Sequence, residues 1–162
     1  MDAKTLKGMA VVSLQEGTRL GRVEQPLFDL AARQLRGVEV HGDDGTFLVP
    51  FEQIDSIGSD AITVTSSQVT QTPNPGGAVG TLMGLEELER LKVVDNEGTL
   101  LGALDTIEFD PLTGLVTQLS AHKGGMLGMG GTTTQLDASS ILMVGPELLT
   151  VTMDATSVPP TT

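Results

Sequence analysis

The sequence has 162 residues, with 9 Lys or Arg against 21 Asp or Glu, so its formal net charge at pH 7 is −12. A surface of this sign repels phosphate backbones and anionic lipid, which argues against general binding to nucleic acid or to membrane surfaces. The absence of Cys excludes disulfides and thiolate metal sites. Trp and Tyr are also absent and there are four Phe, so a core has to be built mainly from Val, Leu and Ile.

The ends and the uncharged stretches carry no targeting pattern. No apolar run follows the charges of residues 1–4. The uncharged stretch at residues 66–85 contains Pro73, Pro75 and several Gly, whereas a membrane span needs about 20 mostly apolar residues. We therefore expect no signal peptide, no membrane span and a cytoplasmic location.

An internal repeat organises the chain. Two sets of residues match at an offset of 81: 16–21 (EGTRLG) with 97–102 (EGTLLG), and 28–29 (FD) with 109–110 (FD). Further along, residues 54–58 match 141–145 at an offset of 87, so the second copy carries six extra residues between 123 and 134. Such self-similarity predicts two copies of one structural unit.

Short strands are the predicted elements of each copy, because apolar or alternating runs are separated by Gly, Pro and Asp. The expected strands of the first copy are residues 10–13, 20–30, 38–41, 47–50 and 61–64. Those of the second copy include residues 92–95, 101–110 and 119–122. Helix is limited to short turns after Pro50 and within residues 84–91.

These elements predict a mainly β protein made of two small antiparallel β-barrels in tandem, with short helical turns. A barrel also removes exposed sheet edges. The expected organisation is a first barrel at residues 1–65, a flexible Pro/Gly linker at 66–85, a second barrel at 86–153 and a disordered or extended tail at 154–162.

The first copy resembles the PRC-barrel domain. The resemblance rests on the hairpin at residues 17–21 (GTRLG), the strand end at 28–29 (FD), the step at 48–51 (LVPF) and the closing run at 57–62 (IGSDAI). The second copy keeps the first half of this pattern and departs in the second half, where residues 136–139 (LDAS) replace LVPF. It is therefore expected to be a divergent copy of the same module.

The resemblance implies protein–protein docking or self-association without catalysis, and no cofactor. An alternative is a ribosome-assembly or RNA-linked factor, which would need a basic face that a net charge of −12 disfavours. A further alternative is an enzyme with a cryptic site between the barrels, which no sequence motif supports. Family resemblance specifies the fold better than the function.

Candidate metal and phosphate sites are weak in this sequence. His41 and His122 occupy equivalent positions, but each stands alone, whereas a zinc site needs three or four converging ligands. The glycine-rich run at residues 124–131 lacks the Lys-Ser/Thr that follows a phosphate-binding loop. We expect no catalytic, metal or cofactor residues.

Two groups of residues remain as candidate sites. The first group is four glycines that we expect to be structural turn residues of the repeated hairpin: Gly17, Gly21, Gly98 and Gly102. The second group is three apolar residues in the extra segment of the second copy, which are candidate partner contacts: Met126, Leu127 and Met129. The alternative for the second group is that these side chains plug the second barrel or the seam between the barrels.

Overall fold

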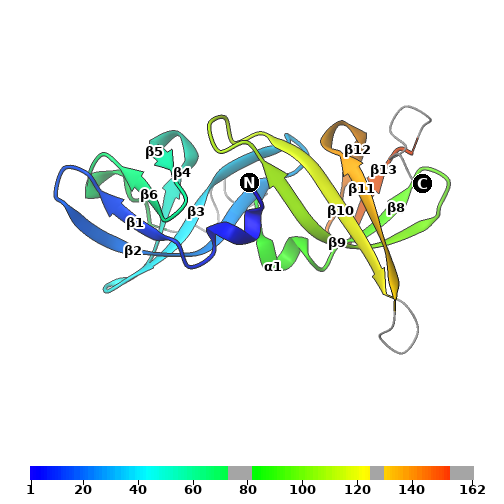
Figure 1. Cartoon of the computed structure of the whole chain (residues 1–162), viewed down its shortest axis with the longest axis horizontal. Coiled ribbons are helices and arrows are strands. Elements are labelled where there is room, and N and C mark those ends of the chain that lie inside the picture. Colours follow the sequence, from blue (N-terminus) through cyan, green and yellow to red (C-terminus); the bar gives the residue numbers. More distant parts are fainter. Residues whose placement is uncertain (73–81, 125–129, 154–162) are drawn as a thin grey trace.

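The computed structural model describes residues 1–72, 82–124 and 130–153. Two sheets lie end to end along the molecule (Figure 1). The first barrel consists of β1 (Ala10–Ser13), β2 (Thr18–Asp29), β3 (Gln34–Gly42), β4 (Gly45–Pro50), β5 (Ile54–Ile57) and β6 (Ala61–Val64), joined by β7 (Met83–Gly84). The second barrel consists of β8 (Lys92–Asp95), β9 (Leu100–Phe109), β10 (Val116–Gly124), β11 (Gly131–Asp137), β12 (Ile141–Val144) and β13 (Leu148–Val151).

The two barrels share one strand order. It runs β4-β3-β2-β1-β6-β5 in the first and β11-β10-β9-β8-β13-β12 in the second. The predicted mainly β fold of two tandem barrel-like units is thereby confirmed. Most neighbouring strands pair antiparallel, as expected, whereas β1 pairs with β6, and β8 with β13, in parallel. A helical turn after β4 and after β11 redirects the chain, so that the last hairpin joins the opposite edge of the sheet.

Among the described residues, helix is confined to single turns, as the sequence predicts. They are η1 (Ala3–Leu6), η2 (Phe51–Gln53), η3 (Ser67–Val69), α1 (Leu85–Leu88) and η6 (Ala138–Ser140). The barrel interiors are filled by aliphatic side chains. Representative fully buried residues are Val11, Val40 and Ile62 in the first barrel, and Val93, Leu119 and Leu149 in the second.

The interior does not stop at the boundary between the barrels. One continuous cluster of buried side chains extends through both. Phe28 at the end of β2 and Phe109 at the end of β9 meet edge to face, with ring centroids 6.2 Å apart and an interplanar angle of 69°. These two residues correspond to each other in the repeat, so the barrels contact each other through equivalent positions. The contact therefore has the reciprocity of a twofold arrangement.

Backbone hydrogen bonds across the boundary are reciprocal too. The N–H of Leu35 donates to the carbonyl of Gly114 at 2.8 Å, and the N–H of Val116 donates to the carbonyl of Arg33 at 2.9 Å. The offset of 81 residues relates one bond to the other. Because backbone groups of both barrels are satisfied at this seam, the barrels form one body.

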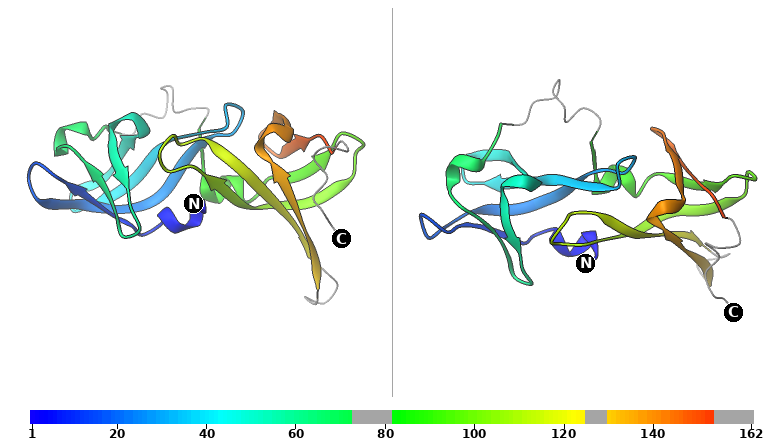
Figure 2. Two further views of the ribbon diagram at one scale, coloured as in Figure 1. Left: turned by 45° about the horizontal axis from the view of Figure 1, so that its top comes forward. Right: turned by 90° about the horizontal axis from the view of Figure 1, so that it is seen from above.

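The segment that begins each repeat crosses to the other barrel. We call residues 1–6 and 83–88 the exchanged arms; both lie in the middle of the molecule (Figures 1 and 2). In the first arm, Asp2 bridges to Glu108 of β9, and the N–H of Phe109 donates to the carbonyl of Met1 at 2.9 Å. In the second arm, Gly84 pairs with Leu27 of β2 and Met83 with Phe28. Each barrel is thus completed by the arm of the other.

The segment expected to be a linker is described at its two ends. At its start, η3 is followed by Gln71, whose N–H and carbonyl bond to the carbonyl and N–H of Leu48 at 2.8 and 2.7 Å. At its end, β7 and α1 pack on the first barrel. Residues 73–81 and the expected tail at 154–162 lie outside the described part of the chain. No helix in the described part is long and apolar enough to cross a membrane.

Candidate functional site

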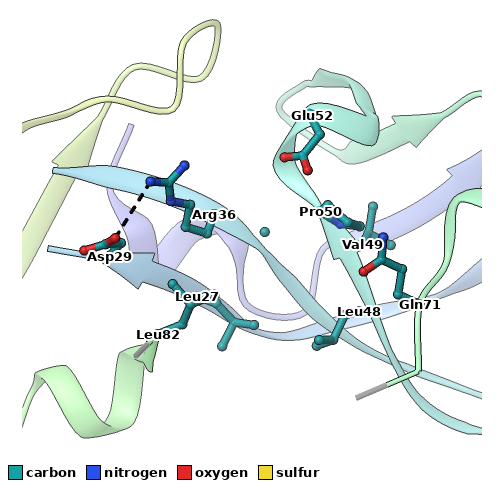
Figure 3. A pocket seen from close by; sticks show the side chains of 10 residues that line it. Leu27, Asp29, Arg36, Leu48, Val49, Pro50, Glu52, Gln71 and Leu82 are labelled. Carbon is teal, nitrogen blue, oxygen red and sulfur yellow. Dashed lines mark ion pairs between the residues drawn. The ribbon is translucent and has the colours of Figure 1, made fainter. Parts of the chain in front are cut away.

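A groove of about 370 Å³ lies on the outer side of the first barrel (Figure 3). It spans β2, β3 and β4 and is bounded by η2 and by the two described ends of residues 66–85. The lining residues are Leu27, Asp29, Arg36, Gly37, Leu48, Val49, Pro50, Glu52, Gln71 and Leu82. The groove thus combines apolar side chains with a rim of charged and amide groups, which is the usual make-up of a ligand site.

Gly37 lines the groove at a close approach of β3 and β4. A Cβ at this position would lie 2.6 Å from the carbonyl oxygen of Val49, so β3 and β4 approach each other where a side chain is missing. The apolar side chains of Leu27 and Leu48 line the groove beside it. The second barrel carries Gln118 at the position that corresponds to Gly37. The groove is therefore built from residues particular to the first barrel.

Arg36 provides the charge at the rim. Its Nη2 lies 3.8 Å from Oδ2 of Asp29, and about half of the Arg36 side-chain surface is exposed. A guanidinium has five N–H donors in a planar fork, and this ion pair uses one edge of it at long range. Arg36 can therefore donate to an oxygen of a molecule in the groove, beside the apolar walls.

An acidic cluster on the same barrel is distinct from the groove. Burial raises the pKa of the Glu39 carboxyl, and the hydrogen bond and negative charge of Glu24 raise it further, while Gln25 opposes the shift. Oε1 of Gln25 is buried and has no hydrogen-bond partner. In the described residues, no group of three or more His, Asp or Glu side chains could hold a metal ion. The cluster has no observed ligand and supports no assignment.

The two histidines do not come together with acidic residues in any such group. His122 is exposed on β10, and its Nδ1 lies 3.0 Å from the hydroxyl of Thr133 on β11. His41 is exposed at the end of β3. Each side chain thus lies on the surface of its own hairpin.

The four glycines fall into two pairs. Gly17 and Gly98 lie at the tips of the first hairpins with φ of 66° and 85°. Gly21 and Gly102 lie where the long strands cross the following strand, and a Cβ on either would collide with the backbone carbonyl of His41 or His122. At Gly102 the backbone φ is also 127°, a conformation that residues with a side chain rarely adopt.

The candidate contact residues Met126, Leu127 and Met129 lie outside the described residues. They belong to the connection between β10 and β11, so the choice between a plug and a contact segment stays open. The described strands of this hairpin extend away from the barrel body (Figure 1).

The fold defines the class of protein: a pair of small β-barrels whose distinguishing features lie on their outer surfaces. Residues 1–71 match the family model of the PRC-barrel domain. The first barrel with its preceding arm therefore belongs to the PRC-barrel family, as the sequence resemblance predicts. No curated protein matches the chain.

Sequence reasoning missed the groove, although part of its signal was present. Gly37 interrupts the apolar and charged alternation of β3 without ending the strand, which is typical of a close backbone approach. No local sequence pattern indicates that Gln71 and Leu82 line the groove, because both come from the segment expected to be a linker.

Proposed function

We propose that the chain is a non-catalytic protein-docking module, in which the two barrels act as one body and the groove of the first barrel receives a partner. The second barrel is, in this proposal, a divergent PRC-barrel copy, which its identical strand order supports. PRC-barrel membership supports a role in protein interaction generally.

The groove carries the proposal. Its apolar floor at Leu27 and Leu48 suits an apolar side chain, and Arg36 offers donors to a carboxylate or carbonyl oxygen next to it. The occupant we propose is an extended segment of another protein that inserts one apolar side chain and accepts a hydrogen bond from Arg36. Interfaces of this kind combine an apolar anchor with a polar rim, and Arg is enriched among residues that dominate binding energy.

The test begins with isolation of partners from the native host by the tagged full chain and their identification by mass spectrometry. The identified protein is then titrated against the wild type, Arg36→Glu and the matched control Arg90→Glu. Arg90 is exposed beyond α1 and is not a groove residue, so both variants change the charge equally. We expect Arg36→Glu to weaken binding at least about tenfold and Arg90→Glu to leave it within about twofold.

Two results would contradict the proposal. Recovery of no protein that binds the purified chain would remove the docking function. Equal binding by the wild type and Arg36→Glu would retain docking but remove the groove as its site.

A further inference from the structure

The outer face of the second barrel is apolar where that of the first is polar. Backbone pairing places Met143, Thr150, Val94 and Leu100 in one row across β12, β13, β8 and β9. The corresponding row of the first barrel is Ser56, Thr63, Val12 and Arg19. The row thus ends in Met143 and Leu100 in the second barrel, and in Ser56 and Arg19 in the first.

The adjacent positions repeat this contrast. Leu142 stands beside Met143 on β12, and their exposed fractions are 56% and 68%. The corresponding residues of β5 are Asp55 and Ser56, both of which hydrogen-bond to the hydroxyl of Thr63. Leu148 and Leu100 are also nearly half exposed. We call Leu142, Met143, Leu148, Val94 and Leu100 the apolar face. Contiguous exposed apolar surface of this kind marks an interaction site, unlike single scattered residues.

Two opposite charges lie at this face. Lys92 lies opposite Leu148 where β8 pairs with β13, and Glu147 directly precedes Leu148 in the chain. Both side chains are exposed, and neither forms an ion pair with another described residue. Lys92 disfavours a basic partner at this face, although the chain as a whole is strongly acidic.

From this arrangement we propose that a second copy of the chain covers the apolar face, through a twofold contact in which Lys92 of each copy meets Glu147 of the other. In a twofold contact the same patch lies on both sides, so one positive and one negative group satisfy each other twice. Two sheet faces can pack in this way at the usual spacing of about 10 Å. The β8–β9 hairpin lies at the end of the molecule away from the first barrel (Figure 1), whereas the turn between β12 and β13 lies beside Leu30 and Ala31 of the first barrel.

The inference rests on the proposed docking function, since it names one partner of such a module, but it uses a different surface. No residue of the apolar face lines the groove of the first barrel. Failure of the dimer and failure of the groove are therefore separate results.

Sedimentation equilibrium of the full chain measures the association directly. We expect a dimer with a Kd in the micromolar range, on the order of 10 µM, that tightens as salt screens the repulsion between two acidic chains. The double variant Leu142→Asp/Met143→Ser places polar groups on the face, as in the first barrel, and should be monomeric. Leu112→Asp is the matched control, because Leu112 is 88% exposed and lies on the turn before β10 instead. It should dimerise like the wild type.

A charge exchange tests the twofold pairing itself. Lys92→Glu and Glu147→Lys should each weaken the dimer about tenfold, and the double exchange Lys92→Glu/Glu147→Lys should restore it. These exposed substitutions should leave thermal stability almost unchanged, which circular dichroism verifies.

Other results overturn the inference. If the wild type is monomeric at about 0.2 mM, far above the expected Kd, a second copy does not cover the apolar face. If, in addition, Leu142→Asp/Met143→Ser loses an isolated partner, another protein occupies the face and the docking function stands. If deletion of residues 154–162 is required before the chain dimerises, its own last segment is the occupant. Dimers that survive the double variant place the contact elsewhere.

Discussion

The turns before β3 and β10 occupy corresponding places at the seam between the barrels, yet they use side-chain size in opposite ways. In the first, Arg33 adopts a φ of 56°, and its Nε donates to the carbonyl of Ala138 at 2.6 Å. In the second, Gly114 stands where Arg33 does, and a Cβ there would lie 3.0 Å from the ring of Phe51. Phe51 and Ala138 are also equivalent positions of the repeat, since they begin η2 and η6. A large side chain thus packs against a small residue on both sides of the seam. The large residue comes from a different place of the repeat in each case, so the two barrels could not be exchanged for each other.

A second pair of equivalent positions has diverged on the long strands of the two barrels. On β9 and β10, the hydroxyls of Thr106 and Ser120 lie 2.6 Å apart and satisfy each other. The first barrel carries Gln25 and Glu39 at these places, where one amide oxygen has no partner and the carboxyl has a raised pKa. The comparison teaches that the strand frame tolerates polar groups in one copy that are less well satisfied than their equivalents in the other.

The largest expected effect breaks the seam. Phe109→Ala and Phe28→Ala each remove one ring of the edge-to-face pair, and each should lower the free energy of unfolding by about 3–5 kcal/mol. Because the core is continuous, urea should unfold each protein in a single transition. Phe47→Ala is the control, since Phe47 is half-buried on β4 outside the seam, and it should cost less. Two separate transitions in the wild type would show that the barrels are independent.

A smaller effect sharpens the comparison of the long strands. Gly21→Ala brings a Cβ against a backbone carbonyl, whereas Gly102→Ala does so at a positive φ as well. We expect losses of about 1–3 kcal/mol, with Gly102→Ala the more destabilising, and Gly102→Val at least as severe. Thermal melts of the three variants provide the measurement. Melting temperatures equal to that of the wild type would mean that the repeated glycines have no structural role.

The smallest effect concerns Glu39 and depends on pH. Its pKa is raised in the folded protein, so the stability linked to its protonated form is complete below the unfolded pKa of about 4.5 and is lost as pH rises through the folded value. Glu39→Gln should therefore be more stable than the wild type at pH 7, by less than about 1 kcal/mol because the carboxyl is only partly buried.

Urea titrations between pH 4 and pH 8 measure this difference. The advantage of Glu39→Gln should grow as pH rises. Glu97→Gln, which removes an exposed carboxylate from the second barrel, is the control for the loss of one negative charge. A constant difference across the range would contradict a strained carboxylate at position 39.

The repeated turn residues made the barrels predictable from sequence. Gly17, Gly98 and the aliphatic alternation are local signals, and each was followed by the strands that it indicates. The exchanged arms were not predictable, because both barrels offer almost the same edge and no local pattern states which one an arm joins. The apolar face was visible in the alignment of Asp55-Ser56 with Leu142-Met143, but only the strand register shows that it continues to Leu100.

The exchanged arms also set the order in which the chain matures during synthesis. A barrel whose strands all precede its linker would ordinarily close as soon as those strands leave the ribosome, since domains fold from the N-terminus at about 5–20 residues per second of elongation. Here β2 waits for Met83 and Gly84, and residues 1–6 wait for β9. The nascent first barrel therefore has unfilled backbone partners on β2 until residues 83–84 are made, and residues 1–6 have no partner strand until β9 is made. A ribosome paused in that interval holds an incomplete barrel, which is then open to chaperones and proteases.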